Sequence, residues 1–208
     1  VKVVLEETVR REAHALRNKI RILAAMAAPA DDIVAARLAL AKVLFLSGDY
    51  NSARYTVDDA DGRLSSSKTS SDRPDDLVDR VMLNKFAALS CRESGLYQFA
   101  QDRYDKISKL LNEASGNGAV ANTSEVQYMK TGLLNEQAVL HYLWANASKE
   151  EAERKKHFAL AESLFQKCSQ QSRLHLKDSD GAKYKRLDEL AQANLSELVK
   201  DLSDRRGV

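Results

Sequence analysis

The sequence predicts an all-α protein made of antiparallel helix pairs, and three observations support that prediction. The 208 residues include only two Pro and eight Gly, so few positions interrupt a helix. Apolar residues recur at the three- and four-residue spacing of an amphipathic helix. One spaced motif occurs three times, as expected for repeated packing units. We expect about eight helices in one domain spanning residues 1–208.

The repeated motif is an aromatic residue followed by small or apolar residues at +3, +7 and +10. This spacing places the four residues on one helix face. The three copies are Tyr50, Ala53, Val57 and Ala60; Tyr97, Ala100, Tyr104 and Ile107; and Phe158, Ala161, Phe165 and Cys168. In the first two copies Gly48 and Gly95 precede the aromatic by two residues. Each glycine is expected to end the preceding helix in the left-handed conformation.

Turn and capping residues divide the first half of the chain into five expected helices. Pro29 follows the first helix, and Asp31 or Asp32 is expected to cap the second. A Ser-rich loop at residues 65–71 separates the third helix from the fourth. These helices are expected at residues 3–27, 31–47, 50–64, 75–94 and 97–114.

Three further helices are expected in the second half. A loop containing Gly116 and Gly118 precedes the first of them. Ser148 is expected to cap the next, with Glu150 and Glu151 near the positive end of its dipole. These helices are expected at residues 124–147, 149–174 and 182–202.

Two segments resemble the tetratricopeptide repeat (TPR), which has a period of about 34 residues. Their matching residues are Leu40, Ala41, Leu44, Gly48, Tyr50, Ala53, Val57 and Ala60 in residues 34–64, and Ala87, Ala88, Cys91, Gly95, Tyr97, Ala100, Tyr104 and Ile107 in residues 81–111. The resemblance implies helix pairs stacked as a right-handed superhelix, an α-solenoid. The alternative is a generic helical bundle whose alanines merely pack.

A third, divergent unit is expected at residues 124–173, followed by a capping helix at 182–202. Its second helix keeps the motif, and Ala138 is the small residue of its first helix. Ala138 stands 23 residues before Ala161, whereas Ala41 stands 12 residues before Ala53. Both helices of this unit are therefore expected to be longer.

The resemblance also implies where a partner would bind, because the first helices of TPR pairs line a concave groove. The residues on that face form a mixed apolar and basic surface, suited to an amphipathic or acidic protein segment. They are Leu38, Lys42, Phe45, Met82, Lys85, Leu89, Arg92, Asn135, Val139 and Tyr142. The alternative is that the last helix of the chain covers them.

A basic stripe on the first helix indicates a second kind of partner, RNA. Arg10, His14, Arg17 and Arg21 fall within about 60° of arc at 100° per residue. A further basic group is Arg154, Lys155 and Lys156. Such residues can follow phosphates, although an ordinary solvated face has the same composition and no aromatic residue is interleaved with the stripe. An acidic protein partner and a self-assembling scaffold are the remaining alternatives.

No pattern in the sequence indicates an enzyme, a cofactor, a metal site or a small-molecule substrate. His14, His141, His157 and His175 match no zinc-binding motif, and His141 and His157 are expected to be structural. Cys91 and Cys168 are expected to be buried free thiols. No apolar run approaches the roughly 20 residues that span a bilayer, so membrane insertion is not expected. The leading hypothesis is a non-enzymatic protein-binding scaffold, intracellular and either cytoplasmic or nuclear.

Overall fold

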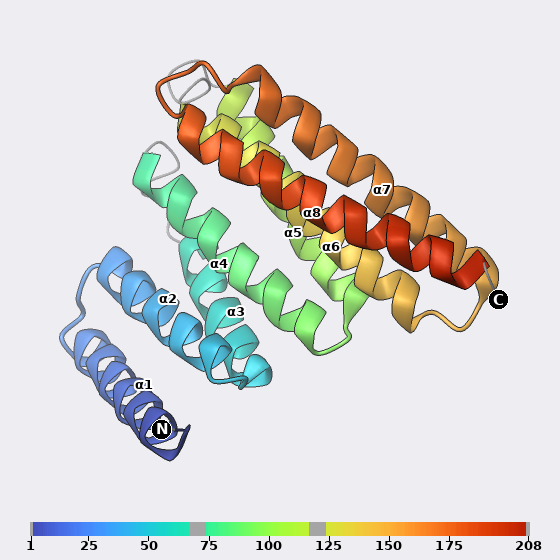
Figure 1. Cartoon of the computed structure of the whole chain (residues 1–208). Coiled ribbons are helices and arrows are strands. Elements are labelled where there is room, and N and C mark those ends of the chain that lie inside the picture. The colour runs from blue at the N-terminus through green and yellow to red at the C-terminus, as the bar shows by residue number, and fades with distance from the viewer. Residues whose placement is uncertain (1, 67–73, 117–123, 207–208) are drawn as a thin grey trace. The chain divides into compact units, whose positions relative to one another are not determined.

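The computed structural model describes residues 2–66, 74–116 and 124–206, with side chains in 7–29, 32–58, 77–114 and 124–205. The described residues form eight α-helices and no strand, which confirms the predicted all-α class (Figure 1). The helices are α1 (Lys2–Ala25), α2 (Ala30–Leu46), α3 (Tyr50–Ser66), α4 (Pro74–Glu93), α5 (Tyr97–Gly116), α6 (Ser124–Ala147), α7 (Glu151–Leu174) and α8 (Gly181–Arg206). Each begins within two residues of its predicted start.

Internal contacts divide the chain into two compact units, Val1–Ala114 and Ser115–Val208. Unit 1 holds α1–α4 and nearly all of α5. Unit 2 holds α6–α8. Each unit is described by itself.

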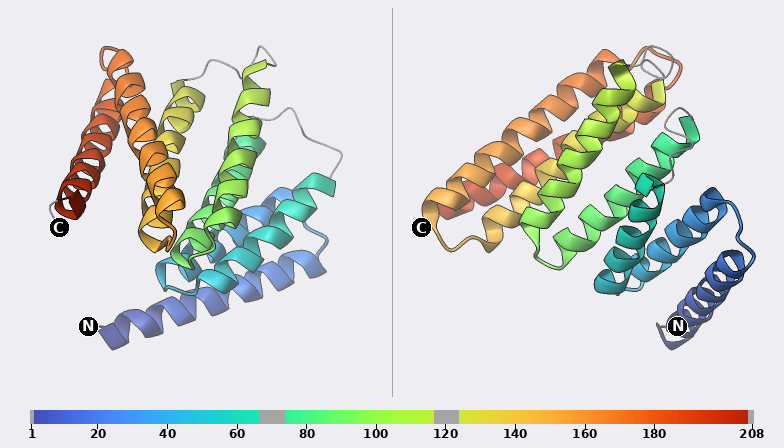
Figure 2. Two further views of the ribbon diagram at one scale, coloured as in Figure 1. Left: turned by 90° about the vertical axis from the view of Figure 1, so that its right-hand side faces the viewer. Right: turned by 180° about the vertical axis from the view of Figure 1, so that it is seen from behind.

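Unit 1 is a sequence of helices packed on their neighbours. Helix α2 contacts α1 on one side and α3 on the other, and α4 contacts both α2 and α3, as Figure 2 shows. Helix α5 is tied to this group by Arg103, whose guanidinium donates to the Oδ1 of Asn84 on α4 at 3.1 Å and to Asp58 on α3. Two apolar clusters form the core. The first contains Val34, Ala41, Val57, Leu83 and Ala87, and the second contains Ala13, Leu40, Val43, Leu44 and Ala53.

Unit 2 is a three-helix bundle in which α7 packs on both α6 and α8, and α6 also touches α8. Its core contains Ala138, Ala145, Phe158, Ala161, Phe165 and Leu198. Helices α6 and α7 have 24 residues each, whereas α2 and α3 have 17 each. The predicted lengthening of this helix pair is therefore confirmed.

The repeated motif marks buried helix faces in both units. Its small members Ala53, Ala100 and Ala161 are each 0% exposed, so neighbouring helices approach closely there. The large members at the +7 position, Tyr104 and Phe165, are no more than 1% exposed. Ala60 lies outside the described side chains.

Gly48 and Gly95 end α2 and α4 as predicted, with φ of +82° and +74°. After α2, the N–H of Asp49 donates to the carbonyl of Leu44 at 3.0 Å, and that of Gly48 donates to Phe45 at 3.0 Å. The same pair of bonds follows α4, from Leu96 to Cys91 at 2.8 Å and from Gly95 to Arg92 at 3.0 Å. Both ends are Schellman motifs, which satisfy helix carbonyls that would otherwise lack a donor.

Two predicted caps are wrong because the helices begin elsewhere. Helix α2 begins at Ala30 after Pro29, so Asp31 and Asp32 lie inside its first turn. Helix α7 begins after Glu150, and the hydroxyl of Ser148 donates back to the carbonyl of Trp144 at 2.8 Å. Ser148 therefore finishes α6 and does not begin α7.

Candidate functional site: a basic cleft in unit 1

Helices α1, α2 and α3 surround an open cleft of about 340 Å³, here called the α1–α3 cleft. Among the described side chains, its lining combines three arginines, two aliphatic side chains, one aromatic ring and one hydroxyl. These residues are Arg17, Ile20, Arg21, Arg37, Leu40, Tyr55 and Thr56. All of these described lining residues belong to unit 1.

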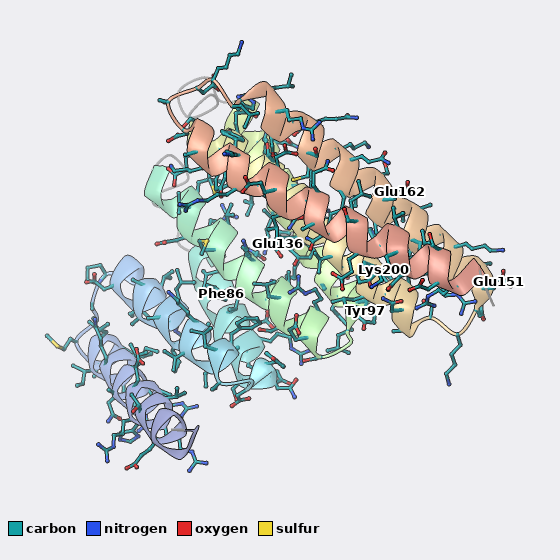
Figure 3. The ribbon with its side chains drawn as sticks, in the orientation of Figure 1. Phe86, Tyr97, Glu136, Glu151, Glu162 and Lys200 are labelled. Carbon is teal, nitrogen blue, oxygen red and sulfur yellow. The ribbon has the colours of Figure 1, made fainter. Side chains whose placement is uncertain are left out.

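The apolar side of α1 sets the position of its two cleft arginines. Leu16 and Ile20 pack against the cluster that contains Ala13 and Leu40. This contact fixes the rotation of α1 on α2, and Arg17 and Arg21 then stand at the cleft edge, about 40° apart around the helix axis. Side chains project from α1 on several sides in Figure 3. Arg10 and His14 continue the stripe along α1 without lining the cleft.

Helices α2 and α3 supply the rest of the cleft. Arg37 on α2 is only 9% exposed, whereas the ring of Tyr55 on α3 is 65% exposed. The guanidinium carbon of Arg54 lies 5.0 Å from the centre of that ring, within cation–π range. The hydroxyl of Thr56 donates to the carbonyl of Ser52 at 2.8 Å. The cleft thus has a cationic wall, an aliphatic floor of Ile20 and Leu40, and an exposed aromatic edge.

The two cleft arginines of α1, Arg17 and Arg21, have no acidic partner among the described side chains. Within the described side chains, no Asp or Glu lines the cleft, and none forms an ion pair with Arg10, Arg17 or Arg21. Arg11 on the same helix differs, because it pairs with Glu7 at 2.5 Å. Arg17 and Arg21 also stand one turn apart, where like charges repel. An anionic ligand would relieve that repulsion.

Sequence reasoning identified Arg17 and Arg21 but missed Arg37, Leu40 and Tyr55 as parts of this cleft. Tyr55 was not connected to the basic stripe because 33 residues separate it from Arg21. Only the packing of α3 on α2 and of α2 on α1 brings these side chains together. One signal was available in the sequence: Tyr55 follows the buried Ala53 of the motif by two residues, which places its ring on the opposite, outward side of the helix.

The second predicted basic group lies on α7 in unit 2, and acidic neighbours neutralise part of it. Lys155 pairs at 2.5 Å with Glu151, the first residue of α7, which Figure 3 labels. Lys156 lies 3.5 Å from Glu153. Arg154 lines a separate open cleft of about 580 Å³ between α7 and the end of α8, whose lining also contains Glu151 and Asp204. Because acidic side chains line this second cleft, we expect it to attract anions less strongly than the α1–α3 cleft.

The predicted groove residues of unit 1 lie on α2 and α4, and none of them lines the α1–α3 cleft. Leu38 packs against the cluster of Val34 and Leu83, and Phe45 packs against that of Leu40 and Leu44. Lys42 is exposed. The α4 members are half-buried: Met82, Lys85, Leu89 and Arg92. Arg92 also bonds to Glu93 at 2.9 Å.

The groove residues of unit 2 are engaged by the last helix. Asn135 is 5% exposed, and its Oδ1 accepts a hydrogen bond from Asn194 of α8 at 3.2 Å. The hydroxyl of Tyr142 donates to Asp201 of α8, and burial followed by this bond raises the pKa of Tyr142 to about 12. Val139 packs against the unit 2 core. For these residues the geometry matches the alternative in which the last helix covers the face.

A histidine pair is the other polar feature of unit 2. The Nδ1 atoms of His141 on α6 and His157 on α7 lie 3.0 Å apart, and the Trp144 ring stacks on His157 with centroids 4.1 Å apart. Burial is the main cause that lowers the pKa of His141 to about 4, and the charges of His157 and Lys156 contribute to the same shift. Across the described part of the chain, no three His, Cys, Asp or Glu side chains are grouped to hold a metal ion.

Both cysteines are buried free thiols, as predicted. Burial raises the pKa of Cys168 to about 11, so this thiol is protonated and unreactive near neutral pH. Of the helices that the model describes, none combines the length and the apolar character needed to cross a membrane.

Comparison of the chain with protein-family models, curated protein sequences and solved structures finds no match in any of the three.

Proposed function

We propose that this protein is a non-enzymatic binding module whose first unit holds an acidic segment of a partner protein in the α1–α3 cleft. The observation that carries the proposal is that Arg17 and Arg21 line the cleft and form no ion pair with a described carboxylate. Ile20 and Leu40 offer an apolar floor to a side chain of the same segment. Charge complementarity would speed association and select acidic partners over basic ones.

The proposed architecture is a divergent TPR-like array in which the helix pairs stack as a right-handed superhelix. Its support is the buried motif face around Ala53 and Ala100 and the glycine-terminated first helices at Gly48 and Gly95. In such an array the faces of successive helices form one extended binding surface. We propose that the exposed part of the groove, around Lys42, extends the contact with the same partner.

The test is binding of a defined acidic probe to the full chain. A fluorescein-labelled pool of random peptides rich in Asp, Glu and Leu is titrated with the protein, and a matched Lys-rich pool is the control. We expect the acidic pool to bind, and Arg17→Glu with Arg21→Glu to remove binding. Arg11→Glu is the matched control, because Arg11 is on α1 but pairs with Glu7. If the double variant and the Arg11→Glu control bind the acidic pool equally well, the cleft is not the binding site. If only Lys42→Glu removes binding, the binding site is the groove.

RNA is the second candidate ligand, favoured by the exposed ring of Tyr55 beside the arginines. Base stacking on an aromatic ring contributes about 1–3 kcal/mol per base in single-strand sites. Filter binding with poly(U) tests this candidate. If the protein binds RNA, the retention of poly(U) should fall steeply as salt is added and should drop in the Tyr55→Ala variant. If no poly(U) is retained at low salt, RNA is excluded as the ligand.

A further inference from the structure

We infer that the acidic segment of the partner is an α-helix that lies along α1, with three carboxylates spaced to meet Arg10, Arg17 and Arg21. This inference rests on the proposed function, because it names the form of the partner that the same surface recognises. It depends on two features of unit 1, which are a straight line of arginines on α1 and the apolar floor of the cleft beside that line.

The three arginines form a straight line on an exposed face of α1. Arg10, Arg17 and Arg21 are all exposed, and none of them pairs with a carboxylate among the described side chains. A helix rises about 1.5 Å and turns about 100° per residue, so the intervals along α1 are about 10.5 Å and about 6 Å, and the line is about 40° wide. His14 also stands on this line, where its Nε2 lies 3.0 Å from the Nδ2 of Asn18. The permanent charges on this line are therefore the three arginines.

This line of charge is longer than the cleft. Arg17 and Arg21 line the cleft, whereas Arg10 stands about 10.5 Å further along α1 and does not line it. A single acidic side chain bound in the cleft cannot also reach Arg10, so a compact anion leaves that charge unused. An elongated partner that runs along the axis of α1 meets all three arginines.

A partner helix reproduces the intervals between the arginines, and an extended strand does not. Residues four and eleven positions along a helix lie about 6 Å and about 16.5 Å from the first, on one face about 40° wide. A strand places side chains on one face about every 6.7 Å, at about 6.7, 13.4 and 20 Å. Measured from Arg21, the other two arginines stand at about 6 Å and about 16.5 Å, so a strand matches Arg17 but misses Arg10 by about 3 Å. Of these two forms, the helix aligns a carboxylate with each arginine.

The apolar floor of the cleft supports the same form of partner. Ile20 and Leu40 line the cleft together with the two arginines, and Tyr55 of α3 lines it from a third helix. An amphipathic helix that binds in a groove uses apolar side chains three or four residues apart as its anchors. Apolar residues beside the acidic line of such a helix can pack on Ile20 and Leu40 while its carboxylates meet the arginines. Charge complementarity and apolar contact then come from one face of one helix.

The experiment compares synthetic peptides that have the same composition, with three Glu and a few Leu in an Ala-rich sequence. In two register peptides the Glu residues are spaced four and then seven residues apart, or seven and then four, to meet the arginines in the antiparallel and parallel directions. In the evenly spaced peptide both intervals are five residues, which spreads the charges around the helix. A fourth peptide has the Glu spacing of the better register peptide and a central Pro that breaks the helix. Fluorescence anisotropy measures binding of each peptide to the full chain at constant ionic strength.

The spacing and the helical form should both affect affinity. We expect the better register peptide to bind about tenfold more tightly than the evenly spaced peptide, because all three ion pairs form at once. The Pro-containing peptide should lose this advantage. Which of the two register peptides binds more tightly gives the direction of the partner helix relative to α1.

Substitution of Arg10 tests how far the contact extends along α1. Arg10→Gln should weaken binding of the register peptide about two- to fivefold, and Arg11→Gln should not change it, because Arg11 pairs with Glu7. In the peptide, Gln in place of the Glu that stands seven residues from its neighbour removes the carboxylate that meets Arg10. This change should weaken binding to the original chain but not to Arg10→Gln, as a double-mutant cycle requires. Both arginines are exposed on α1, so the variants should remain folded, which circular dichroism verifies.

The results separate this inference from the proposed function. If the register, evenly spaced and Pro-containing peptides bind equally, or if Arg10→Gln does not weaken binding, the helical partner is overturned and the acidic segment in the cleft stands. The same conclusion follows if the random acidic pool binds and neither register peptide does. If neither the pool nor any of these peptides binds, both the inference and the proposed function are overturned.

Discussion

The Nδ1 atom of His141 lies 3.0 Å from the Nδ1 atom of His157, and both side chains are buried, at 8% and 3% exposure. One ring must donate its N–H and the other must accept through a lone pair, so the two Nδ1 atoms carry a single proton between them. Trp144 stacks on His157, and the Nε2 of His157 lies 3.3 Å from Glu153. A proton on both Nδ1 atoms would replace this hydrogen bond between α6 and α7 with a repulsion between two donors.

Mild acid should therefore weaken unit 2. Burial lowers the pKa of both histidines in the folded chain, to about 4 for His141 from an ordinary 6.5. Below pH 6.5 the unfolded chain binds protons that the folded chain does not, so the free energy of unfolding falls as the pH falls towards about 4. His141 alone corresponds to about 3 kcal/mol over this range. Urea denaturation at several pH values, followed by fluorescence of Trp144, the single tryptophan, measures the loss.

Two variants separate this effect from general acid sensitivity. His141→Asn together with His157→Asn should flatten the pH dependence between 6.5 and 4, even if the double variant is less stable throughout. His14→Asn is the control, because His14 is exposed on α1 and should leave the dependence unchanged. A double variant with the same pH slope as the original chain would contradict the assignment.

Arg103 should stabilise unit 1, because its hydrogen bonds connect α5 to α4 and to α3. It donates to the fully buried Asn84 of α4 and to Asp58 of α3. Arg103→Met keeps the aliphatic stem but removes these donors, and we expect a loss of about 1–3 kcal/mol in unfolding free energy. Lys109→Met on the same helix is the control, since its side chain is 78% exposed and should change stability by no more than about 0.5 kcal/mol. Thermal denaturation followed by circular dichroism compares the two, and equal melting temperatures would refute the role.

The small members of the repeated motif should resist enlargement. Ala161 is 0% exposed where α7 packs in the unit 2 core, and Ala161→Leu should destabilise the bundle by about 1–3 kcal/mol through overpacking. Ala159→Leu is the matched control, because Ala159 is exposed on the same helix. Chemical denaturation read from Trp144 fluorescence distinguishes them. Comparable stability of the two variants would show that the motif face tolerates larger side chains.

The sequence predicted the helices and their buried faces because these depend on local periodicity and on turn residues such as Gly48 and Gly95. It did not predict the α1–α3 cleft, because Arg37 and Tyr55 reach Arg17 only through the packing of three helices. The sequence indicated that His141 and His157 are structural, but it did not predict their contact, because that contact depends on the register of α6 against α7. For Asn135 and Tyr142 the sequence left a partner and the last helix as alternatives, and it could not choose between them because the hydrogen bonds to α8 depend on tertiary packing.

Two glycines should respond to the same substitution with opposite signs. Gly95 has φ of +74°, which costs an L-residue about 1–2 kcal/mol, so Gly95→Ala should destabilise the turn after α4 even though no atom lies within 4 Å of the added Cβ. Gly132 is inside α6 with no left-handed φ and has the same open space. Gly132→Ala should therefore stabilise the chain by up to about 1 kcal/mol through better helix propensity. The urea midpoints of the two variants, measured side by side, test this prediction. If both midpoints shift in the same direction, backbone conformation does not decide whether Ala stabilises or destabilises the chain.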